Sequence, residues 1–437
     1  MEKSSPPNSV AHTTAAKTTV ATTTAVVRVI NERAVYEQIR RLGTASASQL
    51  VAATGLSKAT IGLAFGSLER VGLISQVGHR VGQVGRAPRL YEIRPDAGRA
   101  MAVDVGASWI RLAVADLSGT ITARADHRVR TLAASALADQ IGELARATAA
   151  EAGVTLADIT HTVLGFPGIY EPDADRITAA PNLPGWEEPG SVSALRAELG
   201  PRFSIDNDVN LATVAEQEHG AGAGTDNFVF VSVGTGIGMG IVIDGELYRG
   251  SSGRAGEISY LPVGAGLGAG LGAGLGNGLG DGLGAGLSDG PGDGPGQLLA
   301  PDVRQHGILE TVASADGVLS AARRLGLTAS STEQVFDAAR SGDQAAIQVV
   351  HDEASHLARA LAAVIAVLDP GLIVIGGGVG GNADLLLDPT KQLLGDLLAL
   401  SPPPIEMSVL GRDAVVLGGL AAGLDRARDD VLAHIQA

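Results

Sequence analysis

The sequence predicts an α/β protein, with an N-terminal winged helix-turn-helix followed by a two-lobed α/β domain. Three observations support this. Short helical segments dominate up to Pro95, strand segments alternate with long helices after it, and two later blocks each begin with strands enclosing a glycine turn. The expected division is a disordered tail at 1–27, a winged helix-turn-helix at 28–95, a first lobe at 100–225 and a second lobe at 226–437.

Apolar spacing and capping residues define the N-terminal elements. Val35, Ile39 and Leu42 lie on one face of a helix, and Ser57 is a suitable N-cap for a later one. Leucine, valine and isoleucine runs then indicate a strand pair. The expected elements are helices at 31–42, 48–54 and 58–71 and strands at 73–77 and 90–93.

The two later blocks show a similar order of apolar strands and alanine-rich helices. Each begins with strands around a glycine turn, DVGAS in one block and GTGIGMG in the other. This likeness predicts two α/β lobes with a ligand cleft between them. The expected strands are 101–105, 110–115, 121–129, 162–166, 228–233, 239–243 and 372–375, with helices at 133–152, 344–368 and 413–435.

The composition indicates a large aliphatic core and an uneven charge. Of 437 residues, 45% are hydrophobic but only 3% aromatic, which predicts close helix–sheet packing. The chain has no Cys, which excludes disulfides, thiolate zinc sites and a cysteine nucleophile. The first 100 residues hold 13 Lys and Arg against 6 Asp and Glu, and the remainder 19 against 41. A basic head on an acidic body indicates a nucleic-acid-binding module, unless the imbalance is ordinary scatter.

No segment has the pattern of a membrane span or a secretory signal. The best candidate, Leu357 to Leu368, contains Arg359 and ends at Asp369-Pro370, well short of the roughly 20 apolar residues that a span needs. We therefore expect a cytoplasmic protein without a membrane partner. Residues 264–296 hold Gly at 16 of 33 positions, a composition typical of a flexible surface insertion.

The stretch Gln49 to Leu73 has the pattern of a helix-turn-helix whose second helix enters a major groove of DNA. Ser57, Lys58 and Thr60 are the candidate contacts at the start of that helix. Arg80 and Arg86 lie in the following basic loop, where a wing could reach a narrow minor groove. The alternative interpretation is a small helical docking domain with a basic loop.

The polar run Asp206-Asn207-Asp208-Val209-Asn210 follows an apolar strand and precedes a helix. Such side chains suit a ligand rich in hydroxyls, and a carboxylate there can act as a general base. The alternative is a helix N-cap with solvated neighbours, because Asp and Asn are favoured caps. Glycine turns such as GTGIGMG can present N–H groups to phosphate, although glycine also serves tight hairpins.

The joint order of ten segments resembles the ROK family (repressors, open reading frames and kinases), from about Asn31 to Leu420. This resemblance implies a winged helix before a sugar-kinase-type domain of the actin/hexokinase (ribonuclease H-like) class. The segments are TGLSKATI, GRAP, DVGASWIRLAVADLSG, GFPGI, PNLPGW, IDNDVN, GTGIGMGIVIDGELYRG, GRAGEI, GILETVAS and LDPGLIVIGGGV.

The resemblance also implies roles for individual residues. The sugar-binding positions fall on Asn207, Asp208, Glu257, Tyr260 and Glu310, with Asp208 in the place of a kinase's catalytic base. The phosphate loops fall on Asp104, Gly106, Gly234, Thr235 and Gly236.

Departures from the family's kinases favour a regulator. Tyr260 replaces a histidine that serves sugar and zinc, and Ile308 replaces the last cysteine of the zinc cluster. Trp109 and Met239 replace residues of the phosphate loops, with Met239 expected to obstruct the approach of phosphate. We therefore expect no zinc or other metal, no required cofactor and little use of ATP.

The sequence thus predicts a sugar-responsive transcriptional regulator, a repressor of carbohydrate-metabolism genes. Its expected partners are operator DNA and a sugar or sugar derivative, and operator symmetry suggests a homodimer or homotetramer. The alternative function is an ATP-dependent, glucokinase-like sugar kinase with a DNA-binding head.

Overall fold

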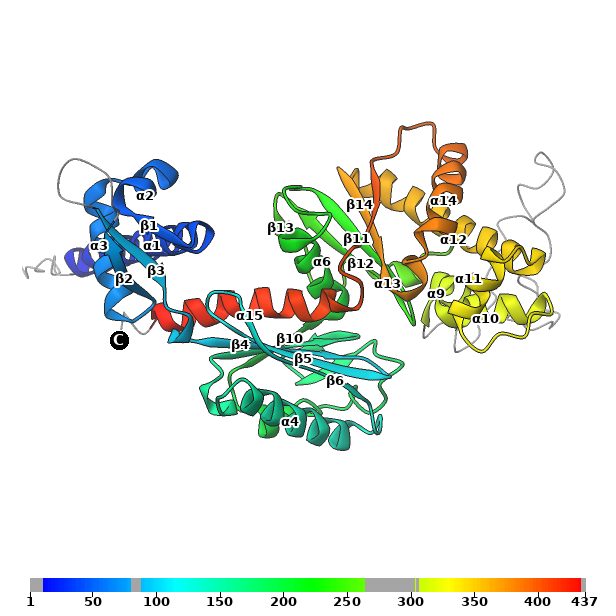
Figure 1. Ribbon diagram of the computed structural model, residues 1–437, viewed down its shortest axis with the longest axis horizontal. Coiled ribbons are helices and arrows are strands. Elements are labelled where there is room, and N and C mark those ends of the chain that lie inside the picture. Colours follow the sequence, from blue (N-terminus) through cyan, green and yellow to red (C-terminus); the bar gives the residue numbers. More distant parts are fainter. Residues whose placement is uncertain (1–10, 80–87, 264–302, 304–305, 434–437) are drawn as a thin grey trace, which may run out of the picture.

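The computed structural model describes residues 11–79, 88–263, 303 and 306–433 (Figure 1). The N-terminal unit, at one end of the molecule, packs three helices against the small antiparallel sheet β1-β3-β2. Its elements are α1 (Ala11–Leu42), β1 (Thr44–Ser46), α2 (Ala47–Thr54), α3 (Lys58–Arg70), β2 (Ile74–His79) and β3 (Arg89–Ile93).

Local sequence signals fix the turn between α2 and α3. Gly55 follows α2 with φ +71°, a conformation that glycine adopts without a steric cost. The Ser57 side chain accepts a hydrogen bond from the Thr60 N–H at 3.1 Å and so caps α3. Helix α1 extends from Ala11 to Leu42, so it begins earlier than the helix expected at 31–42.

Lobe 1 is built on a five-stranded sheet in the order β10-β7-β4-β5-β6. The helices α4 and α5 cover one face of this sheet. Its elements are β4 (Arg99–Val105), β5 (Trp109–Asp116), β6 (Ile121–Arg128), α4 (Ala134–Glu151), β7 (His161–Phe166), β8 (Ile169–Glu171), β9 (Arg176–Thr178), α5 (Ser193–Leu199), β10 (Phe203–Asn207) and α6 (Asp208–His219).

Lobe 2 repeats this topology with the sheet order β13-β12-β11-β14-β15. In both lobes the first three strands are antiparallel and the last two are parallel, so the likeness of the two sequence blocks reflects one repeated sheet. Its elements are β11 (Phe228–Val233), β12 (Ile237–Ile243), β13 (Glu246–Leu247), α9 (Ile308–Ala313), α10 (Ala315–Arg324), α11 (Thr332–Arg340), α12 (Gln344–Leu368), β14 (Leu372–Gly376), α13 (Gly377–Gly380), α14 (Ala383–Leu397), β15 (Ile405–Met407) and α15 (Ala414–Ala433).

Two helices cross between the lobes. Helix α6 follows a strand of lobe 1 but packs on the lobe 2 sheet, whereas α15 follows lobe 2 and packs along the lobe 1 sheet (Figure 1). The last helix of the segment expected as the second lobe, 226–437, thus packs on the sheet of lobe 1. Glycines permit this close packing: a Cβ at Gly419 would lie 2.9 Å from the Ala102 side chain.

The N-terminal unit shares a hydrophobic core with lobe 1 and α15. Tyr36 and Ile39 of α1 belong to the same cluster as Leu117 of lobe 1 and Leu424 of α15. The Tyr36 hydroxyl donates to the Leu117 carbonyl at 3.3 Å. Within the described residues no single helix is long and apolar enough to cross a membrane; α2 and α3 reach that composition only together, across a 115° bend.

Candidate functional site

Asp208 lies at the junction between β10 and α6, where the predicted polar run is found. Asn207 is the N-cap of α6, because its side-chain oxygen accepts from the N–H groups of Val209 at 2.9 Å and Asn210 at 3.2 Å. Its amide also donates to the Gly168 carbonyl at 3.2 Å. Asn207 therefore has the capping role that the sequence left open, and it fixes the start of the helix that carries Asp208.

The Asp208 carboxyl is held in an environment that disfavours its charge. Burial raises the pKa of Asp208 to about 7, with further increases from the charges of Asp104 and Glu257 and an opposing hydrogen bond from the Val209 N–H. The residue nevertheless keeps part of its surface accessible. A carboxyl with a pKa near neutrality and some exposure can accept a hydrogen bond from a ligand hydroxyl, or its proton.

Lobe 2 supplies two more carboxyls to this cluster. Burial and the charge of Glu310 raise the pKa of Glu257, and burial raises the pKa of Glu310. The Glu310 carboxylate accepts from the Ile237 N–H at 2.9 Å and contacts the His306 imidazole at 3.2 Å. Burial, Glu257 and Glu310 also raise the pKa of Tyr260. The structure thus brings Asp208, Glu257, Tyr260 and Glu310 together. We call these four residues and Asn207 the sugar side of the site, after the role that the resemblance implies for them.

Two segments meet at the place where the family's kinases are expected to bind zinc. The 3₁₀ turn η3 (Ile258–Tyr260) lies against the start of α9, because a Cβ at Gly307 would be 2.3 Å from the Ser259 carbonyl oxygen. Tyr260 and Ile308 are therefore close in space. Among the described residues no group of three or more His, Asp or Glu side chains could hold a metal ion. The Gly-rich insertion expected at 264–296 lies outside the described residues.

Asp104 and Gly106 belong to the β4–β5 hairpin of lobe 1. Antiparallel pairing sets Asp104 opposite Arg111, and the guanidinium donates to the buried carboxylate at 2.8 Å. Burial raises the pKa of Asp104 while Arg111 opposes that shift. The Gly106 N–H is used within the turn, where it donates to the Trp109 carbonyl at 2.9 Å. The Arg128 guanidinium lies 4.2 Å over the Trp109 ring.

The second glycine turn joins β11 and β12 in lobe 2. The Gly234 N–H donates to the Gly236 carbonyl at 2.9 Å, and Gly236 lies against the Glu310 carboxylate. Thr235 at the tip is exposed. Met239 does not obstruct this turn as expected, because it lies within β12 and is buried in the lobe 2 core. We call Asp104, Gly106, Gly234, Thr235 and Gly236 the phosphate side of the site.

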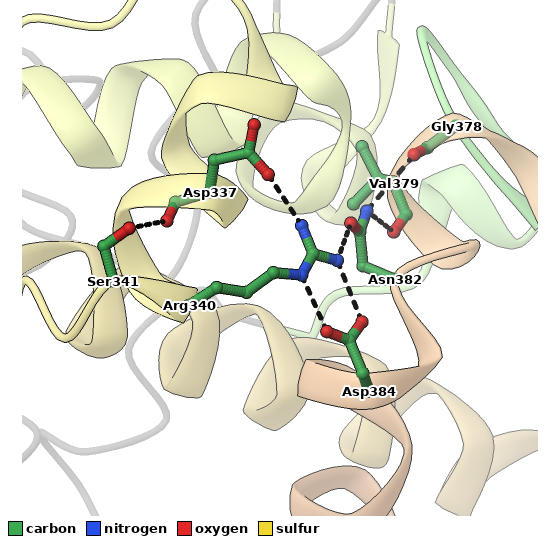
Figure 2. A network of polar contacts seen from close by, with 7 residues as sticks. All are labelled: Asp337, Arg340, Ser341, Gly378, Val379, Asn382 and Asp384. Carbon is green, nitrogen blue, oxygen red and sulfur yellow. Dashed lines mark hydrogen bonds and ion pairs between the residues drawn. The ribbon is translucent and has the colours of Figure 1, made fainter.

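The short helix α13, next to the Gly234 turn, is held in place by a polar network (Figure 2). Arg340 of α11 pairs with Asp384 at 2.7 Å and with Asp337 at 3.0 Å, and it donates to the Asn382 amide oxygen at 2.9 Å. The Asn382 amide in turn donates to the carbonyls of Gly378 and Val379. This network fixes α13 against β11, next to the Gly234 turn.

Two arginines of the segment before Glu257 reach across to lobe 1. Arg249 pairs with Asp206 of β10, and Arg254 pairs with Glu171 of β8 at 3.7 Å. No sequence motif pointed to these arginines, to Arg111 or to His306. The β4–β5 hairpin register is the one signal that could have identified a partner, since a turn at 106–108 sets residue 104 opposite residue 111. Two surface hollows lie elsewhere, one lined by residues such as Leu156 and Arg202 and the other by residues such as Arg40 and Glu92.

The candidate DNA contacts lie at the start of α3. Ser57 and Lys58 are exposed and Thr60 is partly exposed. The Ser57 and Thr60 hydroxyls also hydrogen-bond each other at 2.9 Å. Arg80 and Arg86 lie outside the described residues, between β2 and β3 in the sequence.

Known proteins of two kinds, a glucokinase and a xylose repressor, are similar to this chain. A glucokinase of Halalkalibacterium halodurans is 30% identical over 285 residues, which cover 60% of this chain and 76% of that protein. The xylose repressor of Caldicellulosiruptor bescii is 22% identical over 413 residues, which cover 91% of this chain and 96% of that protein.

Solved structures show the same fold. The crystal structure of a ROK family transcriptional regulator, described as a homolog of the E. coli MLC protein, aligns with a TM-score of 0.70 at 20% identity and covers 94% of this chain and 100% of its own. A ROK family glucokinase from Streptomyces griseus, in complex with glucose and AMPPNP, aligns with a TM-score of 0.58 at 23% identity and covers 75% of this chain and 100% of its own. The sequence profile of the ROK family matches residues 100–423, and the chain therefore belongs to the ROK family.

Proposed function

We propose that this protein is a sugar-responsive DNA-binding transcriptional regulator, a repressor of carbohydrate-metabolism genes. The observation that carries the proposal is the N-terminal unit of three helices and a β-hairpin on a sugar-kinase-type body. The similarity to a xylose repressor extends over 91% of the chain, so most of this unit lies within it. The glucokinase similarity covers 60% of the chain.

The DNA-binding end is the α2–α3 pair. Helix α3 presents Ser57, Lys58 and Thr60 at its N-terminus, the part of a recognition helix that meets base edges and phosphates. A wing between β2 and β3 would add Arg80 and Arg86 to the interface. Symmetric operators require two such ends, so the working assembly is a homodimer or homotetramer.

The ligand-binding end is the sugar side of the site. Asp208, Glu257 and Glu310 offer hydrogen-bond acceptors from both lobes, so one hydroxylated ligand would contact both. A ligand shifts DNA affinity only through its different affinity for two conformations. The core shared by the N-terminal unit, lobe 1 and α15 would carry that difference to α3.

The second candidate function is an ATP-dependent sugar kinase with a DNA-binding head. The retained Asp208, with a pKa of about 7, favours it because that pKa suits a general base. Against it, Asp104 is paired with Arg111 and the N–H groups of Gly106 and Gly234 are used within their own turns. We propose that ATP is not required and that no structural zinc is bound.

The DNA-binding half of the proposal is tested with the full chain and duplexes selected from a random pool. Affinity should fall steeply with salt, because basic side chains displace counterions from phosphates. Arg86→Ala should weaken binding and lower the salt slope by about 1. Unchanged affinity of this variant for a selected duplex would remove Arg86 from the interface, and failure to select any duplex would contradict DNA binding altogether.

The ligand half is tested by a thermal-shift screen of D-xylose, D-glucose and N-acetylhexosamines, followed by DNA binding with each hit. A regulator should release or bind DNA in response to a hit without turning over ATP. Sugar-dependent ATP turnover that is lost in Asp208→Asn would favour the kinase.

A further inference from the structure

The outer face of α3 has a composition that its own packing does not require. The inner face is buried through Ile61, Ala64, Phe65, Ser67 and Leu68. On the outer face Leu63 has 75% of its side chain exposed. Gly62 and Gly66 lie on the same exposed face, and a Cβ at either would meet no atom within 4 Å beyond the neighbouring residues and backbone of the helix itself.

These residues lower the stability of helix α3 and make no packing contact that offsets the loss. Glycine costs a helix up to about 1 kcal/mol relative to alanine, and here alanine would fit. An exposed leucine also leaves apolar surface in water. Because neither choice stabilises the unit, the face suits a partner that approaches the helix closely on both sides of one apolar side chain.

The partner that fits this face is the major groove, given the proposed function on which this inference rests. Leu63 cannot form hydrogen bonds, so against most base edges it would desolvate polar atoms without replacing their partners. The thymine 5-methyl is the one apolar group on the major-groove edge. A protein interface is a poorer match, because a single leucine among glycines offers too little apolar area.

We propose that Leu63 is a specificity-determining residue that contacts a thymine methyl group in each operator half-site. The hydroxyls of Ser57 and Thr60 are engaged in the helix cap. These residues place the helix on the sugar-phosphate backbone of the DNA. Leu63, one turn further along α3, reads an A·T pair. The open positions at Gly62 and Gly66 allow the helix to lie deep enough for this contact.

The test uses full-length protein and a duplex selected from a random pool, with each thymine replaced in turn by deoxyuridine, which lacks the methyl group. Wild type should lose about fourfold in affinity, the value of one buried methyl-sized group, at one thymine of each half-site. Leu63→Ala should bind the intact duplex more weakly and lose sensitivity at that thymine. Leu42→Ala, an exposed leucine at the end of α1, is the matched control and should behave as wild type.

Each outcome decides the inference. Sensitivity that disappears only in Leu63→Ala supports it. No thymine sensitivity in wild type, or the same sensitivity in Leu63→Ala, overturns it while the proposed DNA-binding function stands. Failure to select any duplex overturns both. Gly66→Ala adds an independent readout: it should raise the melting temperature of the full-length protein and weaken DNA binding, and stronger DNA binding would contradict the close approach.

Discussion

The sugar side and the phosphate side of the site differ in how their polar groups are used. On the sugar side, neither Asp208 nor Glu257 forms an ion pair with a described residue, and their pKa values are raised. On the phosphate side, Asp104 is paired with Arg111, and the N–H groups of Gly106 and Gly234 close their own turns. Asp208 and Glu257 therefore lack an ion-pair partner among the described residues, whereas Asp104 and the N–H groups of Gly106 and Gly234 are engaged within their own hairpins. This difference supports the proposal that the protein binds a sugar without transferring phosphate.

The largest effect is expected from breaking the ion pair on the phosphate side. Arg111→Met would leave the buried Asp104 carboxylate without its partner, which costs about 3 kcal/mol or more of unfolding free energy. Urea unfolding followed by the fluorescence of Trp109 and Trp186 measures this. The double variant with Asp104→Asn should recover part of the loss. An unchanged midpoint in Arg111→Met would show that the ion pair with Arg111 does not stabilise the folded protein.

On the sugar side, removing a charge should stabilise the protein. The pKa of Asp208 is raised from 3.8 to about 7, so the folded state binds this proton more tightly than the unfolded chain. The stability contributed by the proton is fully present below about pH 4 and is lost as pH rises through about 7. Asp208→Asn should therefore be more stable than wild type at pH 8, by an amount of the order of a few kcal/mol, with little difference at pH 4.

Unfolding midpoints at pH 4, 6 and 8 test this prediction. Asp139→Asn, on the exposed face of α4, is the matched control and should show no such trend. A destabilised Asp208→Asn at pH 8 would show that the ionised carboxylate has a stabilising partner, and the sugar side would then resemble the phosphate side.

The smallest effect is expected from metal removal. Tyr260 and Ile308 meet where the family's kinases are expected to hold zinc, and the chain has no Cys. Dialysis against a chelator should leave the melting temperature unchanged, and elemental analysis should find no stoichiometric zinc. If about one zinc per chain survives dialysis, this expectation is contradicted. The zinc would then have to be bound by His, Asp or Glu side chains.

The fold could be predicted from local signals to a large extent. Apolar runs such as Phe228 to Val233 and the capped helix after Ser57 follow from periodicity and capping, and the structure has them within a few residues of their expected bounds. The placement of α6 and α15 could not be predicted in this way. Each helix packs on the sheet of the other lobe, and that exchange depends on long-range contacts that periodicity does not encode.

The residues of the candidate site could likewise be predicted only in part. Asp208, Glu257 and Glu310 were assigned from the resemblance to the family, and the structure brings them together. The pair Arg249–Asp206 was missed because its residues lie 43 apart in sequence. The pair His306–Glu310 was missed because the resemblance gave Glu310 a role at the sugar and gave His306 none. Met239 was misplaced because the glycine pattern was extended past the turn into β12.

The most direct test of the central claim is the ligand response of Asp208→Asn on DNA. Fluorescence anisotropy with a selected duplex measures the affinity of wild type and variant, with and without the sugar identified by thermal shift. Losing one buried hydrogen bond weakens ligand binding by about 1–3 kcal/mol. The variant should therefore bind DNA as wild type does without ligand, and respond weakly or not at all when the ligand is added. A normal ligand response in Asp208→Asn would show that the ligand binds elsewhere and would contradict the account.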